Sequence, residues 1–282
     1  MALRPARAAD LPAQYEVFRS AIGELFHRHS FSPSNPPLEA FVAQQGHLLD
    51  HDAAHCFVAE EKGRVVAFSA AFARGKTWYL ASLFVLPGFQ GRGIGRSLLE
   101  RSWGDGYSRR ITLTDSIQPV SNGLYGRAGL IPITPLLHLA GAAARHVSAS
   151  LEAAPPDADV LASLDLAAYG FPRDPDHELW RRTARATLWL RAGEPVAYSY
   201  SWPGGRVGPI AGLDGAAAAA ALTGELASGT GERTVLVPGT SRELVEAALT
   251  AGLRFRGPPG LVLLSHGSEP PRSLALSGYS LF

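Results

Sequence analysis

Residues 83–99 read Leu83-Phe84-Val85-Leu86-Pro87-Gly88-Phe89-Gln90-Gly91-Arg92-Gly93-Ile94-Gly95-Arg96-Ser97-Leu98-Leu99, and they decide the fold. An apolar run that begins at Trp78 and has the length of a buried strand ends here, and an amphipathic helix follows. The closely spaced glycines between the two leave backbone N–H groups uncovered at the start of the helix, where the helix dipole favours an anion. Arg92 and Arg96 add positive charge. The stretch therefore predicts a phosphate site.

Two common phosphate-binding loops do not fit these residues. Gly88 and Gly93 have the glycine spacing of a Walker A loop, but Ile94 stands where that loop needs lysine. A Rossmann fingerprint that starts at Gly91 would place Arg96 at the third glycine position, which must be small for close packing of helix on strand. A different kind of phosphate loop is required.

The segment Gln90–Gly95 resembles the Gln/Arg-x-x-Gly-x-Gly/Ala loop of the GNAT superfamily of acyl-CoA N-acyltransferases. The resemblance implies that backbone N–H groups of the loop and helix start hold the pyrophosphate of acetyl-CoA, and that N–H groups at the preceding strand end polarise the thioester carbonyl. The implied pyrophosphate contacts are Gln90, Gly91, Arg92, Gly93, Ile94, Gly95 and Arg96, and the implied strand-end contacts are Leu83, Phe84 and Val85.

A second segment, Gln118–Leu130, resembles the GNAT signature in which a Leu-Tyr pair is followed by Gly-Phe. The resemblance implies that Tyr125 protonates the departing thiolate, which is chemically reasonable because the pKa of a phenol is close to that of a thiol. The family's Asn position is Gln118 here, while Asn122 lies three residues before the tyrosine. Either amide is a candidate contact for the pantetheine arm of the cosubstrate.

The acceptor amine must lose a proton before it attacks, so the reaction needs a base or a water relay. Asp115 is the best-placed acidic residue, because it follows the predicted strand Ile111–Thr114. Glu24, His27 and His29 are weaker candidates in the first helices. A turn or capping role for Asp115 is an equally good interpretation.

Two helices are predicted before the central strands, one after an N-cap at Asp10 and one over Leu38–Asp50. His47, His51 and His55 are spaced so that a continuous helix would stack them on one face. No carboxylate is clearly placed to complete a metal site with them. We therefore expect no metal.

Length and composition favour a two-domain globular protein. The chain has 282 residues, of which 46% are hydrophobic and 18% are charged, with a net charge of +1. Near-neutral charge gives no bulk attraction to nucleic acid or to a membrane surface. The lone Cys56 excludes an internal disulfide framework. With neither a signal peptide nor an apolar run of spanning length expected, a cytoplasmic location is predicted.

The second half of the sequence repeats the pattern of the first but lacks its phosphate loop and its tyrosine. The segment Thr187–Ser199 parallels the predicted hairpin Cys56–Ser69, and Leu213-Asp214-Gly215 stands where the phosphate loop would be. This second loop lacks paired glycines and arginines, and Ala248 takes the place of Tyr125. The repeat predicts a mixed α/β architecture of two tandem GNAT-like domains, a catalytic domain over residues 1–148 and a degenerate one over residues 149–282.

The resemblance as a whole implies an N-acetyltransferase that moves the acetyl group of acetyl-CoA to a primary amine, with one cosubstrate per chain. Partners would be a small-molecule or peptide amine, with the protein a monomer or homodimer. Two alternatives remain open. One is a non-catalytic acyl-CoA-binding or regulatory protein, and the other is an acyltransferase with a longer acyl chain or a peptide or aminoacyl acceptor.

Overall fold

The computed structural model describes residues 1–33, 35–144 and 148–282. Their contacts divide the chain into two compact units. Unit 1 holds residues 1–112 and 117–130, and unit 2 holds residues 113–116 and 131–282. The predicted boundary after residue 148 falls inside unit 2, and the assignment of the second half as a GNAT-like domain stays a prediction.

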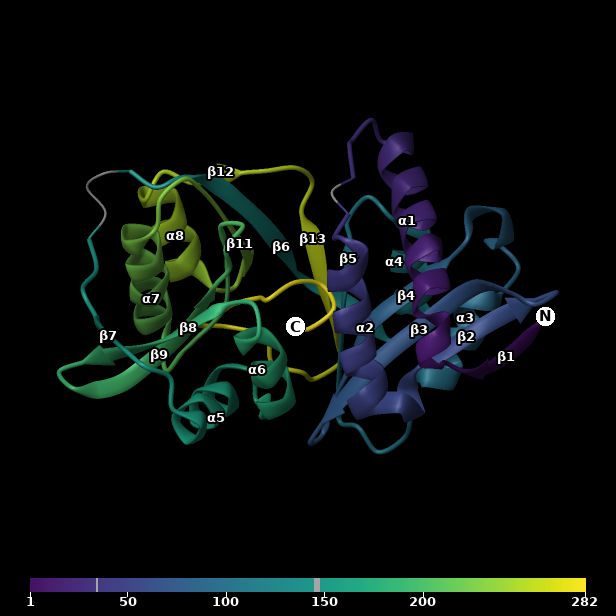
Figure 1. The fold of residues 1–282 in the computed structure, drawn as a ribbon, viewed down its shortest axis with the longest axis horizontal. Coiled ribbons are helices and arrows are strands. Elements are labelled where there is room, and N and C mark those ends of the chain that lie inside the picture. The colour runs from purple at the N-terminus through teal and green to yellow at the C-terminus, as the bar shows by residue number, and fades with distance from the viewer. Residues whose placement is uncertain (34, 145–147) are drawn as a thin grey trace. The chain divides into compact units, whose positions relative to one another are not determined.

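Unit 1 is a mixed sheet covered by helices on both faces. Its strands run in the order β1-β2-β3-β4-β5, with neighbours antiparallel except β4 and β5, which are parallel. Helices α1 and α2 lie on one face of this sheet and α3 on the other (Figure 1). The strands are β1 Ala2–Pro5, β2 Phe57–Glu61, β3 Arg64–Arg74, β4 Thr77–Val85 and β5 Arg109–Asp115, and the helices are α1 Leu11–Arg28, α2 Leu38–Asp52, α3 Ile94–Ser102 and α4 Pro119–Arg127.

The core of unit 1 forms where these helices press apolar side chains onto the sheet. Val17 of α1, Phe41 of α2 and Leu98 of α3 are all buried in one cluster with residues of β2 and β3. The core thereby fixes α3, and with it the glycine loop that precedes it.

Unit 2 also has a mixed sheet, whose strands run in the order β13-β6-β11-β10-β9-β8-β7. Strands β10 and β11 are parallel, as β4 and β5 are in unit 1. The strands are β6 Leu130–Ala142, β7 Glu152–Ala154, β8 Arg185–Arg191, β9 Glu194–Ser201, β10 Arg206–Gly212, β11 Glu232–Pro238, β12 Arg254–Phe255, β13 Gly260–Ser265 and β14 Leu274–Ala275, and the helices are α5 Ala158–Ala168, α6 Asp174–Arg181, α7 Gly215–Ser228 and α8 Arg242–Thr250.

The predicted internal likeness of the two hairpins is seen in their turns. Lys62 and Gly63 join β2 to β3 with φ of 52° and 78°, and Ala192 and Gly193 join β8 to β9 with φ of 53° and 83°. Two consecutive left-handed residues match the type I′ geometry that suits the twist of a two-residue hairpin. The two hairpins therefore share a turn type as well as a sequence pattern.

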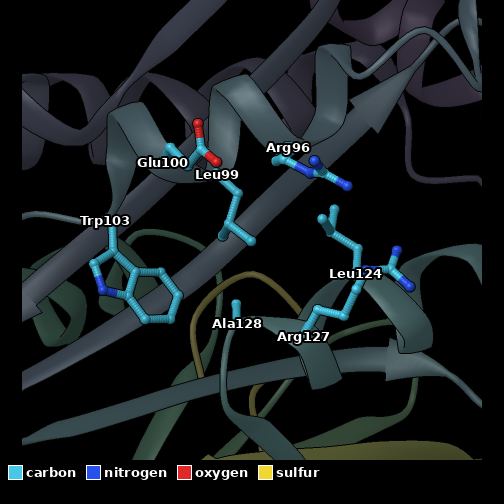
Figure 2. Close-up of a pocket in the computed structure, with 7 residues that line it drawn as sticks. All are labelled: Arg96, Leu99, Glu100, Trp103, Leu124, Arg127 and Ala128. Carbon is cyan, nitrogen blue, oxygen red and sulfur yellow. The ribbon is translucent and has the colours of Figure 1, made fainter.

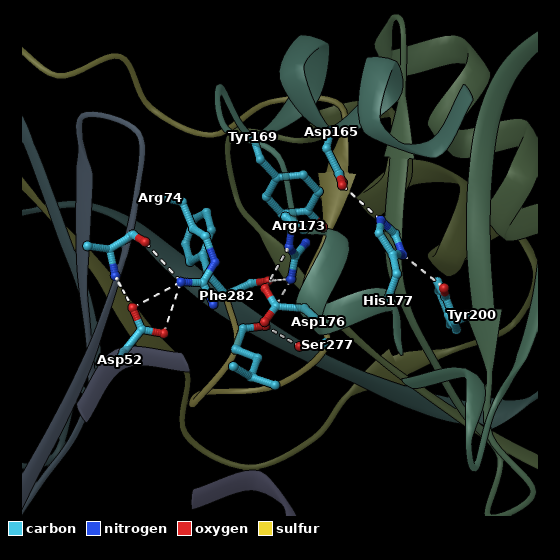
Figure 3. Close-up of polar contacts among 12 residues, drawn as sticks. Asp52, Arg74, Asp165, Tyr169, Arg173, Asp176, His177, Tyr200, Ser277 and Phe282 are labelled. Carbon is cyan, nitrogen blue, oxygen red and sulfur yellow. Dashed lines mark hydrogen bonds and ion pairs between the residues drawn. The ribbon is translucent and has the colours of Figure 1, made fainter. Parts of the chain in front are cut away.

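A fully buried polar network lies in the core of unit 2 (Figure 3). The Asp165 carboxylate accepts a hydrogen bond of 2.6 Å from the Tyr198 hydroxyl and lies 2.8 Å from Nε2 of His177. Nδ1 of His177 is 2.9 Å from the Tyr200 hydroxyl. Because each group has a partner, the network avoids the cost of burying unsatisfied polar atoms.

None of the helices in the described ranges has both the length and the apolar character needed to cross a bilayer.

Candidate acyl-CoA site

Strand β4 carries a bulge where its pairing with β5 ends. On β3, Ala70 pairs with Ser82 and Ala71 pairs with Leu80, so Ala81 is one extra residue on β4. The parallel pairing of β4 with β5 extends as far as Leu80 and Thr112. Beyond the bulge, the edge of β4 that faces away from β3 has no partner strand among the described residues of unit 1. The last residues of β4 can therefore offer backbone groups to a ligand.

In an antiparallel pair, the backbone groups of successive residues point alternately toward the partner strand and away from it. The three predicted strand-end donors therefore do not all point to the open edge. Because the Leu86 N–H donates to the Val66 carbonyl at 2.9 Å, every second residue before it also faces β3. Phe84 is thus directed to β3, while the backbone groups of Leu83 and Val85 point to the open edge. The Val85 carbonyl there accepts a hydrogen bond of 3.1 Å from Nε2 of Gln90. The N–H groups of Leu83 and Val85 are therefore both candidate donors on this edge, whereas the N–H of Phe84 is directed to β3.

The glycine loop has the left-handed geometry that its sequence predicts. Gly91 and Gly93 have φ of 77° and 79°, a region in which residues with a Cβ are strained. Gly93 is the N-cap of α3 and provides no side-chain cap. The first turn of a helix has N–H groups without intrahelical acceptors, so those of Ile94, Gly95 and Arg96 are open to an anion. The backbone thus has the uncapped helix start on which the predicted phosphate site depends.

The two arginines of the loop differ in what they contact. Arg92 donates from its guanidinium to the Gly88 carbonyl at 2.8 Å and lies over the Phe89 ring, 4.9 Å from its centroid. It therefore helps to hold the loop in shape. Arg96 is exposed and makes no hydrogen bond or ion pair within the described part of the chain. Its charge is free for a ligand.

Helix α4 carries the predicted tyrosine and both candidate amides. Gln118 is the N-cap, and its side chain accepts a hydrogen bond of 3.3 Å from the Val120 N–H. Asn122 lies on the helix three residues before Tyr125, a spacing that puts both on one face. Burial raises the pKa of the Tyr125 hydroxyl far above that of a free phenol, and a hydrogen bond with Ser121 opposes this only in part. Tyr125 therefore stays protonated.

Asp115, the predicted base, belongs to unit 2, whereas Tyr125 belongs to unit 1. Burial raises the pKa of the Asp115 carboxyl to about 6, and a hydrogen bond with the Tyr279 hydroxyl partly offsets that rise. The same hydroxyl lies 2.9 Å from Nε2 of His138. A carboxyl with this pKa is mostly ionised at neutral pH and still basic enough to take a proton.

A cavity of about 560 Å³ lies between α3 and α4 (Figure 2), and sequence reasoning did not find it. Its lining residues come from two helices that are far apart in the sequence. No local sequence motif therefore marks the cavity. Arg96 is the one lining residue also predicted for the loop. The cavity is lined by Arg96, Leu99, Glu100, Trp103, Leu124, Arg127 and Ala128.

No single helix carries His47, His51 and His55, because α2 ends at Asp52. His47 and His51 do lie together, with ring centroids 4.6 Å apart. The ring of His55 instead contacts the Ser102 carbonyl at 3.0 Å and the Tyr107 hydroxyl at 3.1 Å. No group of three His, Cys, Asp or Glu side chains suited to a metal ion occurs within residues 1–33, 35–144 and 148–282.

At the corresponding place in unit 2, the start of helix α7 is negatively charged, unlike the start of α3. The N-cap of α7 is Asp214, whose carboxylate accepts a hydrogen bond of 2.6 Å from the Ala217 N–H. The Glu243 carboxylate lies against Gly215 at the same helix start. Two carboxylates cover this end, so it repels an anion. Ala248, in the position of Tyr125, is fully buried and has no proton to give.

The part of the chain that holds the candidate site matches a known protein family. Residues 19–130 match the model of the Acetyltransferase (GNAT) family. This range contains the loop, α3 and Tyr125. No curated protein sequence matches the chain significantly.

Several solved structures share the fold of the whole chain. A proposed acetyltransferase from Pyrococcus horikoshii is 17% identical and has a TM-score of 0.79, with 100% of this chain and 95% of that chain covered. A GCN5-related N-acetyltransferase from Sphaerobacter thermophilus is 17% identical, with a TM-score of 0.62 and coverage of 94% and 95%. One from Kribbella flavida is 17% identical, with a TM-score of 0.59 and coverage of 93% and 71%. At this identity the likeness establishes the fold.

Proposed function

We propose that this chain, whose residues 19–130 match the model of the Acetyltransferase (GNAT) family, transfers the acetyl group of acetyl-CoA to a primary amine. The observation that carries the proposal is the start of α3, where Gly93 leaves three consecutive N–H groups uncapped beside the free cation Arg96. An uncapped helix start with added positive charge suits a diphosphate.

The residues present fit acetyl-CoA at each end of its reactive arm. The left-handed Gly91 and Gly93 let the backbone approach the pyrophosphate without an intervening Cβ. The open edge of β4 begins just after the bulge at Ala81, a few residues before the glycine loop. The Leu83 N–H on this edge can donate to the carbonyl oxygen of the thioester, which gains negative charge as the amine attacks.

The bound thioester would supply the acetyl group, and side chains of the protein would manage the protons. Tyr125 holds its proton at Oη and would donate it to the departing sulfur. Its raised pKa keeps that proton in place at neutral pH, although it also makes the hydroxyl a weaker acid than a free phenol. The assignment of Asp115 as the base stays a prediction from the sequence, with which its pKa of about 6 is compatible.

Release of free CoA thiol from acetyl-CoA, measured with a panel of small amines and peptides with free amino groups, tests this function. Turnover with at least one amine supports it. Tight binding of acetyl-CoA without turnover for any amine would favour the alternative of a non-catalytic acyl-CoA-binding protein. Failure to bind CoA would overturn both. A preference for peptides over small amines would point to the peptide-acceptor alternative.

A further inference from the structure

Helix α2 has a glutamine in the middle of its buried face. Gln45 stands between Phe41 and Leu48 at spacings of four and three residues, so the three side chains lie on one face of the helix. Phe41 and Leu48 are apolar core residues, and only 3% of Gln45 is exposed. A buried amide lowers the stability of a protein unless its donor and acceptor groups are both hydrogen-bonded.

The amide of Gln45 is paired at one end only. Its Nε2 donates a hydrogen bond of 3.0 Å to Oγ of Ser82 on β4. Its Oε1 is buried and accepts no hydrogen bond from any residue within the described ranges. The bond to Ser82 fixes the amide, so Oε1 cannot reach another partner without losing the first. A buried acceptor of this kind calls for a donor from outside the chain.

Ser82 places this oxygen next to the open edge of β4. It stands between the bulge at Ala81 and Leu83, whose N–H points to that edge. Successive side chains of a strand point to opposite faces of the sheet. Ser69, the partner of Leu83 on β3, donates to the Leu98 carbonyl of α3, so Leu83 lies on the α3 face. Ser82 contacts α2 on the other face (Figure 1).

The two faces of the sheet differ in what they offer an attacking amine. A nucleophile approaches a carbonyl carbon from above or below the plane of the carbonyl group. A thioester that lies along the β4 edge like an added strand has its carbonyl near the plane of the sheet, so the amine arrives from one face or the other. The nearest side chain on the α3 face is the apolar Leu83. On the α2 face it is Ser82, with Gln45 bonded to it.

The α2 face becomes aromatic and less buried toward the end of β4. Phe84, two residues after Ser82, is only half-buried. Its ring lies 5.1 Å from that of Phe18 and 5.5 Å from that of Phe68. The Phe41 ring is 5.3 Å from that of Phe18. These side chains carry no charge, so they favour a neutral amine over an ammonium ion and an alkyl or aryl group over a carboxylate.

We propose that Gln45 binds the acceptor, with its Oε1 accepting a hydrogen bond from the amine N–H and with Ser82 holding the amide in position. The inference rests on the proposed function, since it needs an acyl-CoA thioester at the open edge of β4. A bond through N–H leaves the lone pair of the nitrogen free to face the carbonyl carbon. An amide oxygen is a weak base, so Gln45 orients the amine and another group takes its proton. The acceptor class is a primary amine on an apolar alkyl or aryl group.

Steady-state kinetics with 2-phenylethylamine at saturating acetyl-CoA tests the role of Gln45. Gln45→Met keeps the length of the side chain and removes the amide, and it should raise the KM for the amine by about five- to tenfold, the usual worth of one hydrogen bond. The calorimetric Kd for acetyl-CoA should stay unchanged. The variant should melt no lower than wild type, because it loses a buried unpaired oxygen. Gln44→Met is the matched control, since Gln44 is the adjacent, half-buried residue of the same helix.

A comparison of 2-phenylethylamine with phenylalanine tests the acceptor class. The two differ by a carboxylate on the carbon that carries the amine. Wild-type kcat/KM should be about tenfold or more higher for 2-phenylethylamine, because the aromatic surroundings offer no partner to a carboxylate. Equal or better turnover of phenylalanine would overturn the acceptor class.

The outcomes separate this inference from the proposed function. An unchanged KM in Gln45→Met overturns the role of Gln45 and leaves the acetyltransferase assignment standing. An equal rise in Gln44→Met, or a matching loss of acetyl-CoA affinity in Gln45→Met, shows a disturbed helix and also overturns that role. If wild-type protein acetylates other amines but not 2-phenylethylamine, the acceptor class is wrong. If it acetylates no amine at all, the proposed function fails, and the inference fails with it.

Discussion

Tyr125 lies in the interior of unit 1, and its burial decides how its hydroxyl group behaves. Only 4% of the residue is exposed, so the charged phenolate is disfavoured and its pKa is raised. The sequence predicted the residue and its role through a resemblance to a motif. It could not predict the shifted pKa, because that depends on the packing around α4.

At this residue, Tyr125→Phe should lower kcat by about a hundredfold or more, which is the usual contribution of a positioned general acid. The Kd for acetyl-CoA should stay nearly unchanged, because the ring and its packing remain. Steady-state turnover with an active amine and calorimetric binding measure the two quantities. Tyr107→Phe is the control, since Tyr107 is bonded to His55 away from the loop. Equal turnover in wild type and Tyr125→Phe would remove Tyr125 from the mechanism.

Asp115 makes stability depend on pH in a predictable direction. Its pKa is about 6 in the folded protein and 3.8 in a free side chain, so between these values the folded state binds a proton that the unfolded chain releases. Stability therefore decreases as pH rises through 6, by at most about 3 kcal/mol. Asp115→Asn removes this loss and should raise the Tm above that of wild type at pH 8.

Thermal melts at pH 4 and pH 8 check the Asp115 prediction, because the gain should vanish at the lower pH. The exposed Asp105 provides a control, and Asp105→Asn should change the Tm equally at both pH values. A gain in Asp115→Asn that is the same at pH 4 and pH 8 would contradict a raised pKa. Turnover of the same variant shows whether the carboxylate also serves as the base.

Single residues also mark where sequence reasoning stops. Leu83, Phe84 and Val85 are equivalent in the pattern, yet the β3–β4 register directs Phe84 to the ladder and Leu83 to the open edge. The extra residue at Ala81, which frees that edge, leaves no signal in the sequence. Gln118 fitted a pantetheine contact equally well before the structure gave its side chain a capping role.

At the scale of elements, strand β4, the glycine loop and helix α3 follow one another in the chain and together carry the proposed contacts to the thioester and the pyrophosphate. Their existence and order were predictable, since β4 spans Thr77–Val85 and the prediction was Trp78–Val85. The first two helices were also predicted, although α2 continues two residues beyond the expected end at Asp50. His55 lies outside the helix that carries His47 and His51, because α2 ends at Asp52.

The loop gives a matched pair of glycine substitutions. Gly93→Ala should weaken CoA binding several-fold, because alanine at a φ of 79° costs about 1 kcal/mol and drives the helix start toward another conformation. Gly95→Ala should fold normally and keep its affinity, since an added Cβ would make ordinary contacts of 3.7 Å with Leu124 and 3.8 Å with Val85. Titration calorimetry with CoA compares the two. Equal affinities in both variants would show that the left-handed cap is not needed.

At the scale of the whole molecule, two units with similar topology differ in what they offer a ligand. The repeat in the sequence predicted the shared hairpin, and the structure adds the shared turn type and a parallel strand pair in each unit. The repeat did not predict that residues 113–116, the end of β5 with Asp115, would group with the second half. Long-range contacts decide such a boundary, and they cannot be read from local sequence.

The buried network of unit 2 should control the stability of that unit. Asp165→Ala leaves the Tyr198 hydroxyl and Nε2 of His177 buried without their partner, which should lower the free energy of unfolding by about 3–5 kcal/mol. Urea denaturation followed by circular dichroism measures the loss. Asp159→Ala, at an exposed site on the same helix, should cost far less. Similar losses in both variants would show that the network contributes little.

CoA binding in folded Asp165→Ala protein should match that of wild type, because the proposed contacts all lie in unit 1. This result would locate the ligand on one half of the chain without any substitution in the site itself. A large loss of affinity at a temperature where the variant is folded would contradict that placement.

The uncapped start of α3 has a consequence for hydrogen exchange. With no acceptor for their protons, the amides of Ile94, Gly95 and Arg96 should exchange with deuterated water almost as fast as those of an open chain. The Ala217 amide at the start of α7 is bonded to Asp214, so it should be protected at all times. A ligand in the cradle would slow exchange at α3 alone. The time course of labelling would then show, amide by amide, which of the two helix starts has its N–H groups bonded by a ligand.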